Sequence, residues 1–311
     1  ECLPLLKKFY CMKEAQVITI PATDSHKDIE SLMMVWKGLQ EGGASRHSCM
    51  INLGGGMVTD LGGFAASTFK RGINFINIPT TLLAMVDASV GGKTGINFGG
   101  LKNEVGVFND SKFVILDTEF LKTLDAENIC SGYAEMLKHG LISTEAMWEE
   151  LVSFDLANPD LKQLQRMVGD SVKVKERIVE QDPHEKGIRK ALNLGHTFGH
   201  AFESWALKRK PILHGYAVAF GLIPELYLSV IKTGFPTEKM RQTVNFIKEN
   251  YGTLNITCDD YDELIELMHH DKKNQNGIIN FTMMGAIGDI RINQTATTEE
   301  IKEALDFFRE G

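Results

Sequence analysis

The chain has 311 residues, of which 33 are Lys or Arg, 41 are Asp or Glu, and 43% are hydrophobic. This size and apolar content suffice for one large core or two smaller ones, and they exclude a disordered or fibrous protein. The formal net charge of −8 argues against a general nucleic-acid or anionic-membrane surface, so a few placed cations would have to hold any anionic ligand. Charges or glycines interrupt every apolar run, and we therefore expect a soluble protein without a membrane span.

The cysteines indicate the cellular compartment of the protein, and the first residues indicate whether the N-terminus is complete. The cysteine count, 5, is odd, and the sequence holds no CxxC pair, so neither a disulfide framework nor a thiolate zinc site is predicted. A reducing, cytoplasmic compartment fits this pattern. The chain starts at Glu1, without Met, inside a predicted helix that runs to Phe9. We expect that an N-terminal segment is missing.

Short β-rich runs alternate with helical patterns in the first part of the chain. The expected elements are a strand at Gln16–Ile20, a helix at Asp28–Gln40, a strand at Cys49–Leu53, a helix at Asp60–Phe69, and strands at Ile73–Ile78 and Phe113–Leu116. Such alternation predicts a parallel sheet with helices on its faces, and nearly continuous apolar strands suit a sheet that is covered on both sides. We predict a Rossmann-like α/β domain over residues 1–124.

Helical patterns dominate from residue 125 onward. Helices are expected at Asn128–Ile142, Asp160–Gln181, Ile188–Leu207, Gly215–Lys232 and Glu300–Phe308, and a β-hairpin at Gly277–Ile292. These patterns predict a mainly α-helical domain over residues 125–311. No flexible linker separates the domains, so we expect a broad interface with a ligand-binding cleft between them.

One predicted helix carries a stripe of side chains suited to bind ligands. The stripe consists of Arg189, Asn193, His196 and His200, and Glu203 extends it by one turn. On a regular helix the first four share an arc of roughly 60°, opposite an apolar face. Solvent-exposed helix faces are usually built from Glu and Lys, so we favour a binding site over a simply hydrated face.

Two histidines of this stripe are candidate metal ligands. His196 and His200 lie one turn apart, although no Glu follows the first His as in the zinc protease motif HExxH. A catalytic zinc needs about three protein ligands and an open position. Candidates for the third ligand include Glu135 and His214.

Glycines in the segment Leu53–Asp60 follow a predicted strand and precede a predicted helix. Glycine allows backbone N–H groups to approach a phosphate, and the start of a helix adds positive potential. The dinucleotide fingerprint GxGxxG fails at its last glycine, where Thr59 stands. A tight structural turn is the alternative interpretation.

The segment Asp87–Thr94 narrowly misses the P-loop pattern GxxxxGK[ST]. Its first glycine is replaced by Asp87, which would place a carboxylate beside the phosphates, so we disfavour a nucleoside triphosphatase. Lys93, together with Lys102 and Asn103, still suggests a cluster for a small anion. Lys102 could equally be an exposed loop residue, and for either Lys93 or Lys102 taken alone we favour that interpretation.

Taken together, these motifs resemble the 3-dehydroquinate synthase family of the sugar-phosphate cyclase superfamily. The resemblance rests on Gly54–Gly56, Arg71-Gly72, Pro79–Ala84, Asp87–Asn97, Lys102-Asn103, Gly132–Lys138 and Leu192–His200, and it runs from about residue 18 to beyond residue 288. It implies an NAD- and zinc-dependent (or cobalt-dependent) lyase of the shikimate pathway, which makes aromatic amino acids. Such an enzyme converts 3-deoxy-D-arabino-heptulosonate 7-phosphate, a sugar-acid phosphate, into 3-dehydroquinate and phosphate.

The resemblance also implies roles for individual residues. Glu135, His196 and His214 become the metal ligands, and His200 becomes a general acid/base or phosphate contact. The implied substrate contacts are Asp87, Lys93, Asn103, Lys138, Lys175, Arg189 and Asn193, with one of Lys272 and Lys273, of which we name Lys273. Arg71 matches an arginine that reaches the neighbouring subunit's site, which implies a homodimer. The implied NAD contacts are Asp24, Lys27, Gly55, Gly56, Met57, Val58, Asp60, Thr80, Thr81, Lys93, Lys102, Phe120, Leu121, Lys122 and Thr123.

This chain departs from the family pattern at several places. The usual Pro-Gly-Glu before the NAD-contacting lysine is Pro21–Asp24 here, and Asp125 and Glu127 replace a usual Pro and Arg. We expect a piece of the family's N-terminal region, with sheet strands and a cofactor-binding acid, to be missing, which would bear on NAD binding rather than on the metal site.

Three alternatives remain open at the level of the sequence. A cyclase of the 2-deoxy-scyllo-inosose synthase type would share metal and cofactor residues, but Arg189 and Lys175 favour a substrate with a carboxylate. A glycerol dehydrogenase-like, metal-dependent alcohol dehydrogenase would accumulate NADH. A catalytically inactive regulator on the same fold would bind no zinc and release no phosphate.

Overall fold

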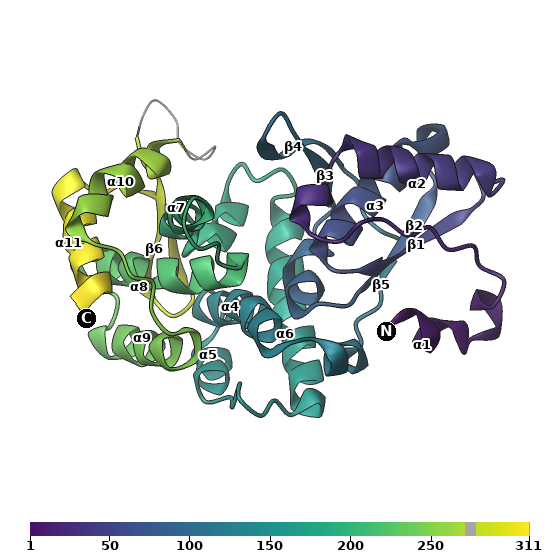
Figure 1. Ribbon diagram of the computed structural model, residues 1–311. Coiled ribbons are helices and arrows are strands. Elements are labelled where there is room, and N and C mark those ends of the chain that lie inside the picture. Colours follow the sequence, from purple (N-terminus) through teal and green to yellow (C-terminus); the bar gives the residue numbers. More distant parts are fainter. Residues whose placement is uncertain (271–277, 311) are drawn as a thin grey trace. The chain divides into compact units, whose positions relative to one another are not determined.

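The computed structural model describes residues 1–270 and 278–310, which form two compact units (Figure 1). Unit 1 comprises Glu1–Asp125 and Leu161–Val172, and unit 2 comprises Ala126–Asp160 and Lys173–Gly311. Helix α6 (Leu161–Gln181) therefore contributes residues to both units.

Unit 1 is built on a parallel three-stranded sheet with the order β1-β2-β5. The strands are β1 (Cys49–Gly54), β2 (Asn74–Pro79) and the short β5 (Phe113–Val114), and α3 (Gly56–Thr68) connects the first two. This is the βαβ unit that the alternating pattern predicts. The predicted strands at 49–53, 73–78 and 113–116 are confirmed, and α3 begins four residues before the predicted helix start at Asp60.

The core of unit 1 lies where α2 (Ile29–Glu41) and α3 pack together and α3 covers the sheet. Leu32, Leu61 and Phe75 are buried in this cluster. The carboxylate of Asp28 caps α2 by accepting a hydrogen bond from the amide of Ser31 at 2.8 Å. The predicted helix at 28–40 is confirmed.

The predicted strand at Gln16–Ile20 is wrong, because this segment has no regular secondary structure. Ile18 and Ile20 nevertheless pack against the core cluster of unit 1. Burial explains their apolar, β-branched character, which does not require pairing with a strand. The predicted N-terminal helix is reduced to α1 (Leu3–Lys7).

Unit 1 also contains a hairpin that the sequence analysis did not predict. Strands β3 (Lys93–Phe98) and β4 (Leu101–Phe108) pair antiparallel across the two-residue turn Gly99-Gly100. Both turn glycines have positive φ angles, 60° and 81°, which favour this tight turn. The stretch therefore carries Lys93 and Lys102 on strands rather than in a glycine-rich loop.

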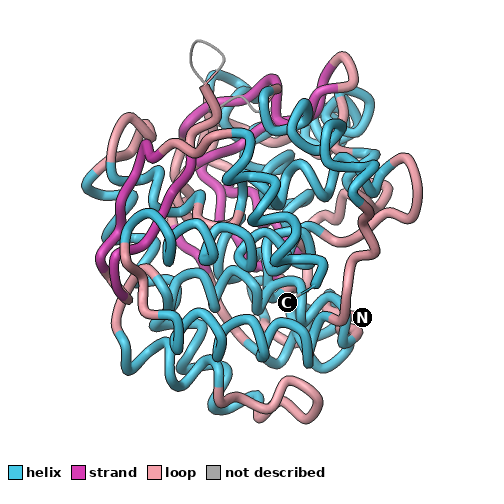
Figure 2. The backbone as a smooth tube through the Cα atoms, turned by 90° about the vertical axis from the view of Figure 1, so that its left-hand side faces the viewer, coloured by secondary structure: helices cyan, strands magenta, loops and turns pink. Residues whose placement is uncertain are grey.

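Unit 2 is mainly helical, as predicted. Its helices are the second half of α6, α4 (Ala126–Leu141), α5 (Glu145–Val152), α7 (His196–Leu207), α8 (His214–Thr233), α9 (Thr237–Tyr251), α10 (Tyr261–His269) and α11 (Thr298–Glu310). Strands β6 (Phe281–Ala286) and β7 (Asp289–Gln294) form the predicted hairpin. Figure 2 shows helices, in cyan, over most of the chain. Helices α5, α9 and α10 were not predicted.

Helix α8 is the centre of unit 2, where α4, α7, α9, α11 and β6 all pack against it. Among the described residues it alone is long and apolar enough to cross a membrane, and 72% of its apolar window is buried inside the structure. The burial accounts for its apolar composition as that of a core helix.

The predicted single helix at Ile188–Leu207 is wrong. A 3₁₀ segment, η6 (Ile188–Asn193), comes first, and α7 begins only at His196. Between them Gly195 adopts φ 81°, a left-handed conformation that ends the first segment. A Cβ at this position would also lie 2.9 Å from the side chain of Leu222. The predicted apolar face opposite the stripe is confirmed only for α7, where Phe198 and Phe202 are fully buried.

Candidate active site

Three potential metal ligands meet in unit 2. Glu135 comes from α4, and His196 and His214 are the first residues of α7 and α8. Nε2 of His196 lies 3.4 Å from Oε1 of Glu135, and Nε2 of His214 lies 3.6 Å from the same oxygen. The ligand atoms of the three residues all lie within 4.8 Å of one another.

These separations suit a tetrahedral metal ion. With metal–ligand bonds of about 2.0–2.1 Å, two ligand atoms of a tetrahedral zinc lie about 3.4 Å apart. Oε1 of Glu135 is buried and has no hydrogen-bond partner in the described part of the chain, although two imidazole nitrogens face it. A cation between one carboxylate oxygen and two imidazoles would satisfy all three groups, so the residues fit zinc.

Hydrogen bonds at Nδ1 orient both imidazoles. Nδ1 of His214 lies 3.1 Å from Oε2 of Glu203, and Nδ1 of His196 lies 3.1 Å from the carbonyl oxygen of Leu194. A proton on each Nδ1 leaves Nε2 to bind a metal, an arrangement common around metal-binding histidines. Glu203, at the end of the predicted stripe, therefore contacts a candidate metal ligand, His214 on α8.

Opposite charges are concentrated at this site. Lys138, one turn after Glu135 and almost fully buried, forms an ion pair with Oε2 of Glu135. Burial raises the pKa of Glu135, but the charges of Lys138 and His196 outweigh it and hold that pKa well below its usual range. Burial lowers the pKa of His214, but Glu135 and Glu203 raise it to about 10. A metal ion bound here would replace the extra proton on His214.

His200 lies beside this cluster on the next turn of α7. Its ring centre is 5.4 Å from that of His196 and 6.0 Å from that of His214. It does not belong to the group of residues whose ligand atoms converge. This position is compatible with a proton-transfer or phosphate-contacting role next to the metal.

Arg189 and Asn193 lie on η6, ahead of the helix that carries the histidines. The backbone amide of Arg189 donates to Oδ2 of Asp182 at 3.1 Å, and its Nη1 donates to the carbonyl oxygen of Pro183 at 2.6 Å. The side-chain amide of Asn193 donates to Oε1 of Glu185 at 3.0 Å. The predicted position of Arg189 and Asn193 on the same helix face as the histidines is therefore wrong, because η6 and α7 are separate segments.

Two further predicted substrate residues of unit 2 are buried cations. Lys138 is 1% exposed and Lys175, on α6, is 6% exposed. Arg189 is likewise 2% exposed. Three of the predicted substrate contacts in unit 2 are therefore buried cations, a residue type suited to bind a carboxylate or a phosphate.

The glycine turn of unit 1 lies at the carboxyl edge of the parallel sheet. Gly54 pairs with Pro79 in register, and the amide of Thr80 donates to the carbonyl oxygen of Gly54 at 2.9 Å. The predicted NAD contacts Gly55, Gly56, Met57, Val58, Thr80 and Thr81 thus follow two adjacent strands. No side chain caps the start of α3 at Gly55, so this edge has the geometry of a nucleotide-binding turn.

Other predicted NAD contacts form a charged cluster in unit 1. Lys27, only 5% exposed, lies 3.0 Å from Oδ2 of Asp60 and 3.5 Å from Oδ1 of Asp24. Lys102 lies 3.8 Å from Asp24. Phe120, Leu121, Lys122 and Thr123 lie together on the 3₁₀ segment η5 (Thr118–Thr123).

The remaining predicted residues of unit 1 are placed as follows. Asp87 lies in a π-helical turn (Ala84–Ala88), Lys93 begins β3, and Asn103 lies on β4 with φ 52°. Arg71 is exposed and has φ 69°. Lys272 and Lys273 lie outside the described residues.

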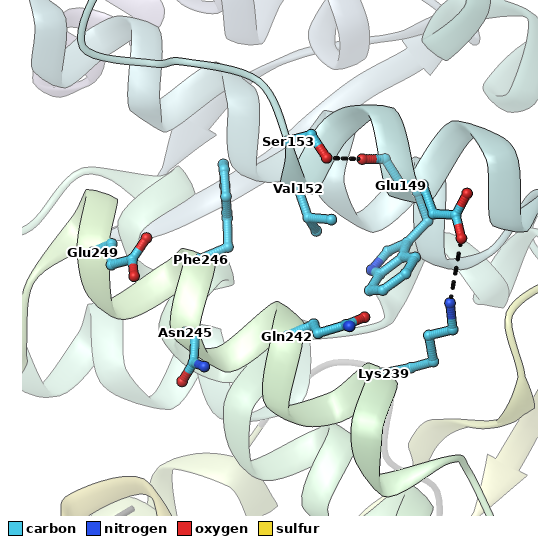
Figure 3. Close-up of a pocket in the computed structure, with 9 residues that line it drawn as sticks. Glu149, Val152, Ser153, Lys239, Gln242, Asn245, Phe246 and Glu249 are labelled. Carbon is cyan, nitrogen blue, oxygen red and sulfur yellow. Dashed lines mark hydrogen bonds and ion pairs between the residues drawn. The ribbon is translucent and has the colours of Figure 1, made fainter.

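A surface hollow of about 360 Å³ lies between α5 and α9, and none of the candidate site residues lines it (Figure 3). It is lined by Trp148, Glu149, Val152, Ser153, Lys239, Gln242, Asn245, Phe246 and Glu249, none of which the sequence analysis selected. Lys239 lies 4.4 Å from the centre of the Trp148 ring and 3.5 Å from Glu149. These contacts join two helices and indicate a structural role.

Comparison with known proteins identifies the family. Residues 17–131 match the family profile described as 3-dehydroquinate synthase N-terminal, and residues 132–274 match the one described as 3-dehydroquinate synthase C-terminal. The chain belongs to the 3-dehydroquinate synthase family. A 3-dehydroquinate synthase of Parabacteroides distasonis is 57% identical over 312 residues, which cover 100% of this chain and 88% of that protein. One of Bordetella pertussis is 38% identical over 93% of this chain and 81% of that protein.

Solved structures agree with the fold of 3-dehydroquinate synthases predicted from the sequence. A 2-epi-5-epi-valiolone synthase of Streptomyces hygroscopicus, with NAD+ and Zn2+ bound, is 26% identical with a TM-score of 0.82 over 94% of this chain and 82% of its own. A 2-deoxy-scyllo-inosose synthase complexed with carbaglucose-6-phosphate, NAD+ and Co2+ shares the fold at 24% identity, with a TM-score of 0.82 over 95% of this chain and 82% of its own. The predicted fold class is confirmed.

Two acids that hold the backbone of the candidate site were not predicted from the sequence. Asp182 accepts hydrogen bonds from the amides of Lys186, Gly187 and Arg189. Glu225, in the middle of apolar α8, accepts hydrogen bonds at the start of α7. A lone acid within a long apolar helix is a signal that could have drawn attention to Glu225.

Proposed function

We propose that this member of the 3-dehydroquinate synthase family converts 3-deoxy-D-arabino-heptulosonate 7-phosphate into 3-dehydroquinate and phosphate. As a carbon–oxygen lyase it would serve the shikimate pathway of aromatic amino acid biosynthesis. The observation that carries the proposal is the convergence of Glu135, His196 and His214, with ligand atoms within 4.8 Å, in a chain 57% identical to a curated synthase.

Glu135, His196 and His214 would hold zinc, or cobalt, in this proposal. When bound, the metal supplies a Lewis acid for the hydroxyl that is oxidised, and NAD+ accepts a hydride that it later returns. Lys138 stays next to the metal-binding carboxylate as a buried cation and would bind a substrate oxygen. His200 would hold or move a proton at a hydroxyl or phosphate oxygen near the metal, since its ring lies 5.4 Å from that of His196.

Basic and amide side chains would hold the substrate's two anionic groups. In unit 2 these are Lys175, Arg189 and Asn193, and in unit 1 they are Lys93 and Asn103, with Asp87 among them. Lys175 and Arg189 would bind these anionic groups as charged hydrogen-bond donors from buried positions. From the C-terminal region, Lys273 or its neighbour Lys272 would join these substrate contacts.

NAD would bind at the carboxyl edge of the parallel sheet in unit 1. The turn Gly54–Gly56 and the uncapped start of α3 would take the pyrophosphate, since backbone amides at a helix start attract anions. The cluster of Asp24, Lys27, Asp60 and Lys102 would contact the rest of the cofactor. The solved valiolone synthase, 26% identical, has NAD+ bound, which supports NAD as the cofactor.

We further propose a cytoplasmic homodimer in which Arg71 acts in the site of the neighbouring subunit. The described cysteines are all free, which suits a reducing compartment. Arg71 is exposed at the end of a left-handed turn, where a partner subunit could contact it.

Mixing inactive Arg71→Ala and His196→Ala subunits tests the exchange of Arg71 between subunits. About half of the dimers should be mixed, and each mixed dimer should have one of its two sites intact, so about a quarter of wild-type activity should return. No return of activity would show that Arg71 acts within its own subunit.

A phosphate-release assay with the seven-carbon substrate, run with and without a chelator, tests the function. We expect chelator-sensitive phosphate release without net change in NADH absorbance. Release from glucose 6-phosphate instead would favour the 2-deoxy-scyllo-inosose synthase alternative, and accumulation of NADH from a simple alcohol would favour the glycerol dehydrogenase-like one. No zinc and no phosphate release with NAD supplied would indicate an inactive regulator.

A further inference from the structure

Glu225 is a fully buried carboxylate in the middle of α8. Its Oε2 accepts a hydrogen bond from the amide of Gly195 at 2.6 Å. Its Oε1 accepts hydrogen bonds from the amides of Thr197 at 2.9 Å and Phe198 at 3.3 Å. The side chain thus caps the start of α7 from a neighbouring helix.

The start of α7 needs this partner. The first amides of any helix lack acceptors within the helix, and leaving them unpaired in a protein interior is costly. The residue before α7 is Gly195, which has no side chain that could cap it. A buried carboxylate also interacts favourably with the positive end of the helix dipole.

Close contact between the two helices allows Glu225 to reach across. Gly221, one turn before Glu225, faces the same side of α8, and a Cβ there would lie 2.0 Å from the carbonyl oxygen of Gly195. A Cβ at Gly199 would lie 2.9 Å from the carbonyl oxygen of Ala217. Glycine on both helices therefore brings their backbones together at the level of the carboxylate.

One peptide group connects Glu225 with His196. The amide that donates to Oε2 of Glu225 belongs to Gly195, and the carbonyl of the same peptide group belongs to Leu194. That carbonyl accepts the hydrogen bond from Nδ1 of His196 at 3.1 Å. A planar peptide held at its N–H end has its C=O end fixed as well.

We infer that Glu225 is a positioning residue for the metal centre, because it fixes the peptide that sets the ring orientation and tautomer of His196. The inference rests on the zinc site of the proposed function. Glu203 on α7 contacts His214 of α8 directly, and Glu225 on α8 acts on His196 of α7 through the peptide. Each helix thus supplies the carboxylate that orients the other helix's candidate ligand.

The substitution Glu225→Gln tests this role, because it keeps the size of the side chain but removes its charge and one acceptor. Zinc affinity is measured by competition with a chelator, without substrate. We expect zinc to bind at least about tenfold more weakly than to the wild type, within the range seen for other groups that orient metal ligands. Because the defect lies in metal binding, saturating zinc should restore kcat/KM to within about threefold of wild type.

Thr243→Val is the matched control. Thr243 is fully buried on α9, where its hydroxyl accepts from Nε1 of Trp148 at 3.0 Å and donates to the carbonyl oxygen of Lys239 at 2.9 Å. This variant should lower the unfolding temperature and leave zinc affinity unchanged. A folded Glu225→Gln protein that binds zinc within twofold of this control overturns the inference, as does a loss of kcat/KM that persists at saturating zinc.

Hydrogen exchange in the wild type tests the same contact without a variant. The amides of Gly195 and Thr197 should exchange at least about a hundredfold more slowly than that of Glu238, which lies in the first turn of α9, a helix with no side-chain cap. Exchange as fast as at Glu238 overturns the inference even if Glu225→Gln does not fold. Intact zinc binding without phosphate release would instead refute the proposed function alone.

Discussion

Glu203 on α7 and His214 on α8 are joined by a hydrogen bond of 3.1 Å between Oε2 and Nδ1, and Nε2 of the same imidazole points toward Glu135 at 3.6 Å. This is the carboxylate–histidine arrangement that increases the basicity of a metal ligand and fixes its ring.

Glu203→Gln should therefore weaken zinc binding by about 10- to 100-fold while the protein stays folded. Chelator competition measures the affinity, and circular dichroism checks the fold. Glu266→Gln is the control, because Glu266 pairs with His270 at 3.0 Å on an exposed part of α10. Equal zinc affinity of the two variants would contradict the assigned role of Glu203.

The two histidines of α7 should differ when each is changed to Ala. His196→Ala removes a candidate ligand, so both zinc and activity should be lost. His200→Ala should retain about one zinc per chain and lose rate by about 10²- to 10⁴-fold, the range of a general acid–base contribution. Atomic absorption measures the zinc content of each variant. Equal zinc content in both variants would refute the assignment of His196 as a ligand and His200 as a proton-transfer group.

Zinc should also stabilise the folded chain measurably. At a free zinc concentration of about 100 times Kd, binding to the folded state alone adds about 2.7 kcal/mol to the free energy of unfolding. The unfolding temperature of the wild type should rise on adding zinc, whereas that of His196→Ala should not. A similar rise in both proteins would place the zinc elsewhere.

Asp182 should matter for substrate affinity because it holds the loop that leads to Arg189. Asp182→Asn replaces one carboxylate oxygen with an NH2 group, which cannot accept a hydrogen bond. If the NH2 group takes the place of Oδ2, the amides of Gly187 and Arg189 lose their acceptor. We expect KM to rise about tenfold with a smaller change in kcat, since hydrogen bonds to charged groups have roughly this effect. An unchanged KM would show that the loop holds Arg189 without this carboxylate.

The same carboxylate predicts a pH dependence of stability. Burial raises the pKa of Asp182, but the amides of Gly187, Lys186 and Arg189 outweigh it, so the net shift is downward. A lowered pKa in the folded state means that the stabilisation is complete above the unfolded pKa of about 3.8 and is lost as the pH falls through the folded value. Asp182→Asn should lose less stability than wild type on acidification from pH 5 to pH 3, and parallel losses would contradict this.

The fold was largely predictable, because strands and helices of unit 1 follow the hydrophobic alternation around β1 and β2. The division of the predicted helix 188–207 into η6 and α7 was not predictable, since a periodicity of 3.6 residues does not reveal that Gly195 adopts a left-handed conformation. The segment at Gln16–Ile20 failed because buried β-branched residues also occur in irregular chain.

The candidate site was predictable to a similar degree. The ligand set Glu135, His196 and His214 came from the family motifs, and the chain spacing alone left His200 as an equal candidate. Glu225 escaped notice because its hydrogen bonds run between helices 27 to 30 residues apart in the sequence, which no local pattern encodes.

Anomalous diffraction at the zinc edge from crystals of the zinc-loaded protein tests the central claim most directly. We predict one strong peak per chain, within about 2.0–2.2 Å of a Glu135 carboxylate oxygen and of Nε2 of both His196 and His214. A zinc ion bound elsewhere, or by only one of these three residues, would contradict the account.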